Sequence, residues 1–291
     1  MSHMDTAGLL KFLDKNKNCS HKTVIMGILN VTPDSFFDGG LYLDKNGAVE
    51  HAIEMIEQGA DIIDIGGEST RPFSDPTSID EELKRVMPVL KNLSRKTQTP
   101  ISIDTYKSEV ARHAIEEGAT IVNDISALTF DPAMAPLIAE TNVPVILMHM
   151  KGTPKNMQSN PLYKDLIKDI KSFFHQKLEI AFKAGIKRDR IIIDPGIGFG
   201  KSFNDNLKII KNLNEFSDLG QPILIGTSNK SFIGNILGPS IESRDTGTMA
   251  TLAAAIMNGA DIVRVHNVKS SRETATIIDA IKAGHPLQFD N

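Results

Sequence analysis

Short apolar runs alternate with amphipathic stretches along almost the whole chain, and each run ends at or just before a polar or charged residue. Eight runs show this pattern, at residues 24–29, 62–65, 101–103, 119–122, 143–148, 191–193, 223–225 and 262–265. Runs that are apolar at nearly every position are typical of strands buried on both faces of a parallel sheet. Eight strand and helix units in alternation predict an α/β fold, a single (β/α)8 TIM barrel.

The amphipathic stretches predict the helices of the barrel. They span residues 45–58, 79–96, 108–117, 132–141, 162–184, 204–213, 244–258 and 270–283. Two connections, 30–44 after the first strand and 66–78 after the second, are longer than the roughly two to six residues usual in α/β units. Barrel enzymes carry their active sites at the carboxyl ends of the strands, where both connections begin. We therefore expect two long active-site loops that can close as lids.

The length and composition bound the answer further. A barrel of this kind uses about 250 residues, so one domain is expected over residues 1–291, with 1–21 as an N-terminal extension in which Ser2-His3-Met4 resembles a cloning remnant. The net charge is −4, without the basic surplus of a nucleic-acid binder. No apolar run reaches the roughly 18 residues of a membrane span. The single cysteine, Cys19, suits a reducing compartment, so a cytoplasmic location is expected.

Acidic and amide side chains end three of the predicted strands. Asp104, Asn123 and Asp194 follow the third, fourth and sixth strands. A buried carboxylate costs several kcal/mol unless it is paired or hydrogen-bonded. The three residues therefore predict a ligand rich in N–H donors, such as a nitrogen heterocycle. The alternative is that they form caps or ion pairs inside the barrel.

Cationic residues are expected on the other side of the barrel mouth. Lys230, Arg264 and His266 lie at the last two strands, where barrels often bind phosphate, and Arg71 lies on the second long loop. An acidic side and a basic side suit one substrate with an N–H-rich head and a phosphate tail. His149 ends the fifth strand, but no zinc-site spacing surrounds it, so a structural or supporting role is expected.

The order of these motifs resembles the dihydropteroate synthase family of pterin-binding TIM barrels. The resemblance covers about residues 24–283. It rests on 27–40 (GILNVTPDSFFDGG), 64–72 (DIGGESTRP), 103–107 (IDTYK), 122–124 (VND), 148–154 (MHMKGTP), 194–201 (DPGIGFGK), 226–234 (GTSNKSFIG) and 264–266 (RVH). Together and in order, at the predicted strand ends, these motifs are specific for the family.

The resemblance implies a transferase of folate biosynthesis and a target of sulfonamides. It condenses 6-hydroxymethyl-7,8-dihydropterin diphosphate with p-aminobenzoate, giving 7,8-dihydropteroate and diphosphate in an SN1-like displacement. The implied pterin site is Asp104, Asn123, Met148, Asp194, Lys230 and Arg264, and the implied diphosphate site is Asn30, Arg264 and His266, with Mg²⁺ at Asn30. The implied p-aminobenzoate site is Phe36, Thr70, Arg71, Pro72, Phe199 and Ser228, and the implied catalytic residues are Asp104, Asp194, Lys230 and Arg71. A homodimer in the cytoplasm is also implied.

Three positions depart from the family pattern. Asn229 lies where Arg is common, Asn267 where Asp is common, and Phe73-Ser74 where a Gly is common. Other readings remain open beside the synthase. A methyltetrahydrofolate:corrinoid methyltransferase has no need for the first loop or for Thr70-Arg71-Pro72. A non-catalytic pterin-binding paralogue is disfavoured by the intact set of Asn30, Arg71, Lys230, Arg264 and His266. A Schiff-base aldolase would use Lys230 as its nucleophile, but the acidic set at the other strand ends gives it no support.

Overall fold

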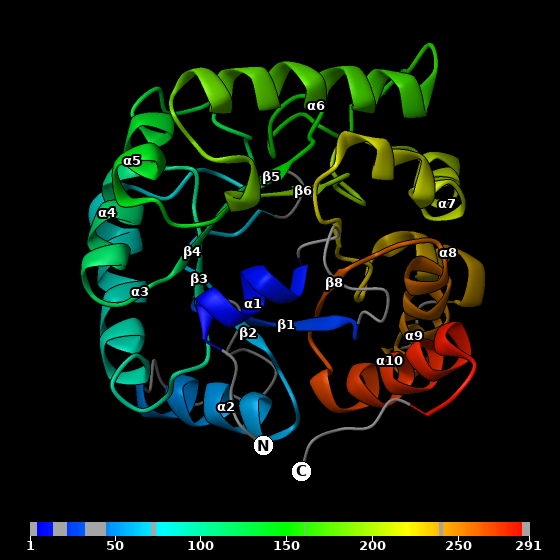
Figure 1. Ribbon diagram of the computed structural model, residues 1–291, viewed down its shortest axis with the longest axis horizontal. Coiled ribbons are helices and arrows are strands. Elements are labelled where there is room, and N and C mark those ends of the chain that lie inside the picture. The colour runs from blue at the N-terminus through cyan, green and yellow to red at the C-terminus, as the bar shows by residue number, and fades with distance from the viewer. Residues whose placement is uncertain are drawn as a thin grey trace.

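Eight parallel strands form one sheet that curls into a nearly closed barrel surrounded by helices (Figure 1). The computed structural model describes residues 5–13, 22–32, 45–70, 74–159, 161–238 and 241–286. The strands are β1 (Val24–Asn30), β2 (Ile62–Gly66), β3 (Ile101–Asp104), β4 (Ile121–Asp124), β5 (Val145–Met148), β6 (Ile191–Asp194), β7 (Leu224–Ile225) and β8 (Ile262–Val265). The predicted TIM barrel is confirmed.

The strands pair in the order β6-β5-β4-β3-β2-β1-β8-β7. Neighbours along this order share regular parallel ladders, as in the pairs Asp64 with Ser102 and Asp104 with Asn123. Between β6 and β7 the ladder shrinks to one bridge, from Ile193 to Ile223. The barrel is therefore closed by full strand pairing everywhere except at this β6–β7 seam.

Helices cover the outside of the barrel and follow the predicted spans closely. They are α2 (Lys45–Glu57), α3 (Ile79–Leu93), α4 (Ser108–Glu116), α5 (Met134–Thr141), α6 (Leu166–Lys183), α7 (Phe203–Lys211), α9 (Ile241–Met257) and α10 (Val268–Ala283). The predicted helix 162–184 begins later, because Asp165 caps α6 by accepting a hydrogen bond from the Lys168 N–H. A further short helix, α8 (Ser231–Leu237), follows the seventh strand where the sequence predicts no separate helix.

A second difference lies before the first strand. Within the predicted N-terminal extension, α1 (Thr6–Leu13) is a helix that lies over the middle of the barrel in Figure 1. Leu9 on this helix is buried, and it packs with inward-facing strand residues such as Met26 and Ile146 in a cluster separate from the main core. The helix thus closes the amino-terminal end of the barrel with an apolar floor.

Two apolar layers hold the fold together. The larger lies between the outward faces of the strands and the helices, and the smaller is the floor inside the barrel. Polar side chains then occupy the inward positions nearer the carboxyl ends of the strands, including Asp64, Asn123 and Asp194. No helix in the described part of the chain combines the length and apolar character that crossing a bilayer requires.

Candidate active site

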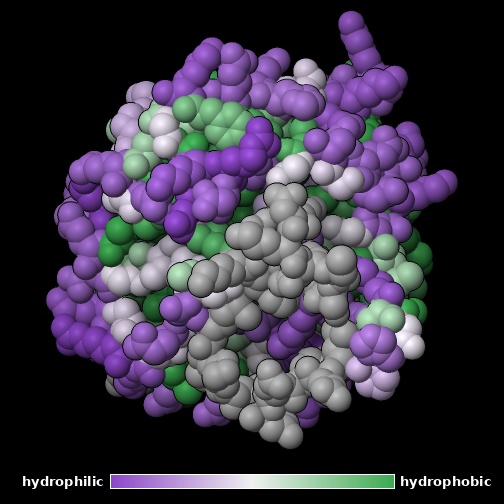
Figure 2. Space-filling view, viewed as in Figure 1, coloured by the Kyte–Doolittle hydropathy of each residue, from purple (hydrophilic) through white to green (hydrophobic). Residues whose placement is uncertain are grey.

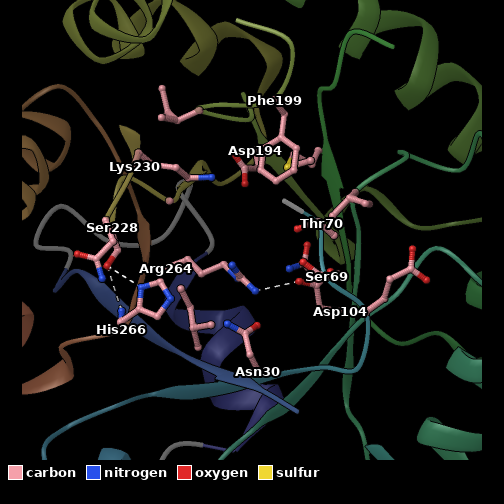
Figure 3. A pocket seen from close by; sticks show the side chains of 18 of the residues that line it. Asn30, Ser69, Thr70, Asp104, Asp194, Phe199, Ser228, Lys230, Arg264 and His266 are labelled. Carbon is pink, nitrogen blue, oxygen red and sulfur yellow. Dashed lines mark hydrogen bonds and ion pairs between the residues drawn. The ribbon is translucent and has the colours of Figure 1, made fainter. Parts of the chain in front are cut away.

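A cavity of about 430 Å³ opens at the carboxyl ends of the strands (Figure 3). Every predicted site residue that the structure describes lines it: Asn30, Thr70, Asp104, Asn123, Met148, Asp194, Phe199, Ser228, Lys230, Arg264 and His266. Phe36, Arg71 and Pro72 lie outside the described residues. Residues from most of the strands therefore meet at one place, as the alternation of strands and polar ends predicts.

Arg264 on β8 crosses the floor of this cavity and binds two carboxylates. Its Nε donates to Asp64 Oδ2 at 2.6 Å, and its Nη2 donates to Asp104 Oδ2 at 2.9 Å. The acidic and basic residues are thus interleaved, whereas the sequence predicts two separate sides. The reason is that a buried carboxylate needs a partner, and the long side chain of Arg264 reaches across the barrel to supply one.

The electrostatic surroundings of Asp104 raise its pKa. Burial raises the pKa of Asp104 to about 7, although the nearby positive charge of Arg264 acts in the opposite direction. The negative charge of Asp64, the second carboxylate on the same arginine, contributes to the rise. Asp104 is therefore a carboxyl group that changes its protonation state near neutral pH.

Asp194 and Lys230 form a second charged group, at the β6–β7 side of the cavity. The Gly196 N–H donates to Asp194 Oδ1 at 2.7 Å, while burial raises the pKa of this carboxyl. Burial, followed by the charge of Arg264, lowers the pKa of Lys230 to about 8. The Lys230 ammonium also lies 4.4 Å from the centre of the Phe199 ring. A ligand here meets a carboxylate, a cation and an aromatic face together.

Apolar side chains form the walls between these charged groups. Ile28, Ile125, Met148, Ile197 and Phe199 all line the cavity. Flat apolar and aromatic surfaces with a few polar groups at the edges are typical of sites for planar ring ligands. The cavity can therefore hold a heterocycle whose edge meets the carboxylates.

A serine and a histidine mark the β7–β8 edge of the cavity. Ser228 Oγ lies 2.9 Å from His266 Nδ1, and the backbone N–H of His266 donates to the same hydroxyl at 3.3 Å. Two of the departures from the family pattern lie next to this pair. Asn229 adopts a left-handed φ of 57°, which asparagine tolerates better than most residues. Asn267 caps α10 by accepting from the Ser270 N–H, as an aspartate would.

His149, for which the sequence predicts a structural or supporting role, packs beside the cavity without lining it. It is buried outside the cavity, and its Nδ1 lies 2.7 Å from the Nζ of Lys201, which also donates to the His149 carbonyl. Burial and the Lys201 charge lower the pKa of His149 to about 2, so the ring is neutral and accepts from the lysine. Lys201 itself was not singled out by the sequence reasoning, because nothing marks a lysine as buried before the fold is known.

A buried ion cluster at the second long loop was also missed. The ammonium of Lys107 contacts the carboxylates of Glu68 and Glu82, and all three side chains are nearly buried. Glu68 also accepts from the Thr77 N–H at 3.1 Å and from the Tyr106 hydroxyl at 3.0 Å. Glu68 lines the cavity and lies within the DIGGESTRP motif, so this motif is the sequence feature that points to Glu68 as a site residue. The cluster ties both ends of the β2–α3 loop to the barrel.

The described residues offer few protein ligands for a metal ion. No group of three or more His, Cys, Asp or Glu side chains in the described ranges could hold one. The Asn30 side chain is exposed at the end of β1 and lines the cavity. Mg²⁺ usually takes only one or two protein oxygens and completes its shell with water and substrate phosphates. An exposed amide oxygen at the mouth of the cavity fits that mode.

Comparisons with known proteins show which family the chain resembles. A family model described as pterin binding enzyme matches residues 26–266. The dihydropteroate synthase of Bacillus subtilis is 49% identical over 260 residues, covering 89% of each chain. That of Escherichia coli is 44% identical over 256 residues, covering 88% of this chain and 90% of the relative.

Solved structures give the same result at the level of the fold. The Yersinia pestis dihydropteroate synthase in complex with a sulfonamide drug is 42% identical, with a TM-score of 0.86 over 90% of this chain and 95% of that chain. The Xanthomonas albilineans enzyme in complex with 7,8-dihydropteroate is 39% identical, with a TM-score of 0.81 over 90% of this chain and 94% of that chain. The chain therefore belongs to the dihydropteroate synthase family of pterin-binding enzymes.

Proposed function

We propose that this chain is a transferase that condenses 6-hydroxymethyl-7,8-dihydropterin diphosphate with p-aminobenzoate, yielding 7,8-dihydropteroate and diphosphate. The observation that carries the proposal is the floor of the cavity. There, Asp104, Asn123 and Asp194 present acceptor oxygens, and Lys230 and Arg264 lie among them. Hydrogen-bond acceptors suit the N–H groups of a pterin, and the cations suit the diphosphate that it carries.

The pterin would lie on the floor between the apolar walls. Asp104, Asn123 and Asp194 would accept hydrogen bonds from its amino and ring N–H groups, while Met148 packs against the ring. Lys230 would hold the pterin from the β7 side, where its Nζ already lies close to the Phe199 ring. Planar stacking with edge-on hydrogen bonds gives both affinity and orientation.

The diphosphate would lie toward the β1–β8 side of the mouth. Arg264 uses only two of its five N–H groups on Asp64 and Asp104, so others remain for a phosphate oxygen. Asn30 and His266 line the same side of the cavity. Mg²⁺ held in part by Asn30 would neutralise charge on the departing diphosphate.

The arylamine would enter from the loop side of the cavity. Thr70, Ser228 and Phe199 line the cavity. Phe36, Arg71 and Pro72, which lie outside the described residues, are proposed to complete the site when the long loops close. Their closure would exclude water from a reactive intermediate. Sulfonamides, which resemble p-aminobenzoate, are proposed to bind there as well.

The chemistry would be an SN1-like substitution at the CH₂ group of the pterin. The C–O bond breaks and its electron pair leaves with the diphosphate. The amine of p-aminobenzoate then forms the C–N bond and loses a proton, which the released diphosphate can accept. Asp104 and Asp194, as carboxylates, would stabilise the positive charge that develops on the pterin, and Lys230 and Arg71 would stabilise the negative charge that leaves. No side chain forms a covalent bond.

A turnover assay tests the proposal. Purified protein, given the pterin diphosphate, p-aminobenzoate and Mg²⁺, should release diphosphate and 7,8-dihydropteroate in equal amounts. Omitting p-aminobenzoate should abolish dihydropteroate formation. A protein that binds the pterin but releases no product would instead be a non-catalytic paralogue, and methyl transfer from methyltetrahydrofolate to a corrinoid would identify a methyltransferase.

We further propose that the enzyme works as a cytoplasmic homodimer, as the family resemblance implies. Exposed apolar side chains on neighbouring helices support this, namely Phe203 and Leu207 on α7, Ile236 and Leu237 on α8, Met257 on α9, and Ile277 and Ile281 on α10. Figure 2 shows hydrophobic residues at the right-hand edge of the molecule, where Figure 1 places α8. Sedimentation of the purified chain should give twice the monomer mass, and a charged substitution at Ile236 should shift this mass toward that of the monomer.

A further inference from the structure

Asp64 lies beneath the cavity and takes no part in its lining. Its side chain on β2 is fully buried. Its Oδ2 accepts hydrogen bonds from Arg264 Nε at 2.6 Å and from Asn123 Nδ2 at 3.2 Å. Asp64 thus contacts one residue of β8 and one of β4, and both of these residues line the cavity above it. A single carboxylate oxygen joins two opposite sides of the site from below.

The contact with Asn123 fixes which way its amide faces. A carboxylate only accepts hydrogen bonds, so the amide must turn its nitrogen toward Asp64. The amide oxygen of Asn123 is then left for a ligand in the cavity. Asn123 therefore offers an acceptor to the substrate, like Asp104 and Asp194. Without Asp64, the amide could turn over and offer a donor in the same place.

The contact with Arg264 fixes the guanidinium in the same way. Nε is held by Asp64 and Nη2 by Asp104, so the plane of the guanidinium is set by two carboxylates. A planar group held at two of its nitrogen atoms keeps its remaining N–H directions fixed before any ligand arrives. Side chains whose orientation is locked by their neighbours hold a site ready for binding.

We propose that Asp64 is a positioning residue for the pterin end of the site, which orients the Asn123 amide and the Arg264 guanidinium without touching the substrate. This inference rests on the proposed function, because it assigns Asn123 and Arg264 to the pterin diphosphate. Asp64 would thereby contribute to ligand specificity. With Asp64 in place, the Asn123 amide oxygen on the cavity floor accepts hydrogen bonds, so the floor favours a heterocycle edge that carries N–H donors.

The substitution Asp64→Asn tests the proposal. The new amide keeps the shape of the side chain, but it removes the charge that pairs with Arg264 and can meet Asn123 with a donor. We expect the Kd and KM for 6-hydroxymethyl-7,8-dihydropterin diphosphate to rise about tenfold or more. The KM for p-aminobenzoate should change less than about threefold, since the side-chain hydrogen bonds of Asp64 among the described residues go to Arg264 and Asn123 and not to Thr70 or Ser228. Equal changes for the two substrates, or none, would overturn the proposal.

Ser102→Ala is the matched control. Ser102 is the register partner of Asp64 on β3, is equally buried, and its Oγ has no hydrogen-bond partner among the described residues. Its loss should leave both KM values unchanged. Thermal unfolding of each variant shows whether it is folded. Should Asp64→Asn not fold, Asp64→Ser, which also removes the charge, should give the same separation of the two KM values.

A double-mutant cycle identifies the route of the effect. If Asp64 acts through Asn123, the loss of pterin affinity in Asp64→Asn combined with Asn123→Ala should be smaller than the product of the two single losses. Multiplicative losses would rule out this route. The wild-type enzyme separates the two proposals: its failure to form dihydropteroate refutes the proposed function, whereas normal turnover with an unaffected Asp64→Asn variant refutes the positioning role alone.

The pH profile gives a readout that a merely structural role would not move. The charges that act on Asp104 are those of Arg264 on β8, Asp64 on β2, Glu82 on α3, Asp124 on β4 and Lys230 after β7. Asp64→Asn removes one of the negative charges that raise the pKa of Asp104, and it leaves Arg264 with Asp104 as its remaining partner. The acid limb of kcat/KM should therefore move to lower pH. A limb that stays in place or moves upward would contradict the proposal.

Discussion

Burial shifts the pKa values of two charged groups at the cavity floor toward neutral pH, in opposite directions. Burial raises the pKa of Asp104 to about 7 and lowers the pKa of Lys230 to about 8. The proposed mechanism needs Asp104 ionised and Lys230 protonated. We therefore predict a bell-shaped profile of kcat/KM, falling below about pH 7 as Asp104 gains a proton and above about pH 8 as Lys230 loses one. Measurement between about pH 5 and about pH 10, about two units beyond each pKa, checks this, and a profile that is flat across that range would contradict it.

Asp194 supports a second prediction at the same scale. Its carboxylate is buried, held by the Gly196 N–H, and close to the charge of Lys230. Asp194→Asn keeps the volume but removes the charge that favours a pterin cation. We expect kcat to fall by about 10²–10³, the usual effect of losing one preorganised electrostatic contact. Near-normal turnover in a folded variant would show that Asp194 has no such role.

The residues that line the cavity could largely be predicted from the sequence, but their partners could not. Asp104, Asn123 and Asp194 each end an apolar run, and a parallel barrel brings such ends together. Asp64 and Lys201 lie within or beside motifs, but whether they face the cavity, the barrel interior or a neighbouring side chain depends on packing. The Arg264 contacts join residues 200 and 160 positions apart in the chain, a separation that no local pattern encodes.

At the scale of elements, the β2–α3 loop depends on a buried ion cluster. Lys107 pairs with Glu68 at the start of this loop and with Glu82 on α3. Lys107→Met leaves two buried carboxylates without their cation, so we predict a loss of about 3–5 kcal/mol in the free energy of unfolding. Lys91→Met breaks the exposed pair with Glu117 and should cost less than about 1 kcal/mol. Urea unfolding of both variants measures the difference, and equal losses would contradict it.

Helices and strands were predicted most accurately where the apolar pattern is strong. The ladders of β1 to β6 and the long helices follow the predicted runs. The short α8 was missed, because its seven residues include Gly234 and carry too few turns to show a helical period. The helix α1 was missed for a similar reason: its eight residues give a weak pattern, and its burial depends on a floor that only the closed barrel provides.

At the scale of the whole molecule, α1 packs against the amino-terminal end of the barrel and completes the apolar cluster inside it. Leu9 is 1% exposed and packs against inward residues of the strands. We predict that Leu9→Ala lowers the free energy of unfolding by about 2–5 kcal/mol, the cost of a cavity in a core. Leu10→Ala, at a half-buried position on the same helix, should cost clearly less. A Leu9 variant as stable as the wild type would show that α1 only rests on the barrel.

The single bridge between β6 and β7 leaves the barrel weakly paired at this seam. Asp194 ends β6 on one side of the seam, and Lys230 follows β7 on the other side. Transient separation of β6 and β7 would move these two charges apart, so a pterin bound by both residues would hold the two strands together. We predict that backbone amides of β7 exchange with deuterium faster than those of β2 and β3, and that bound pterin diphosphate slows them most. Binding of the substrate would then stabilise the part of the barrel with the least strand pairing, next to the residues that bind it.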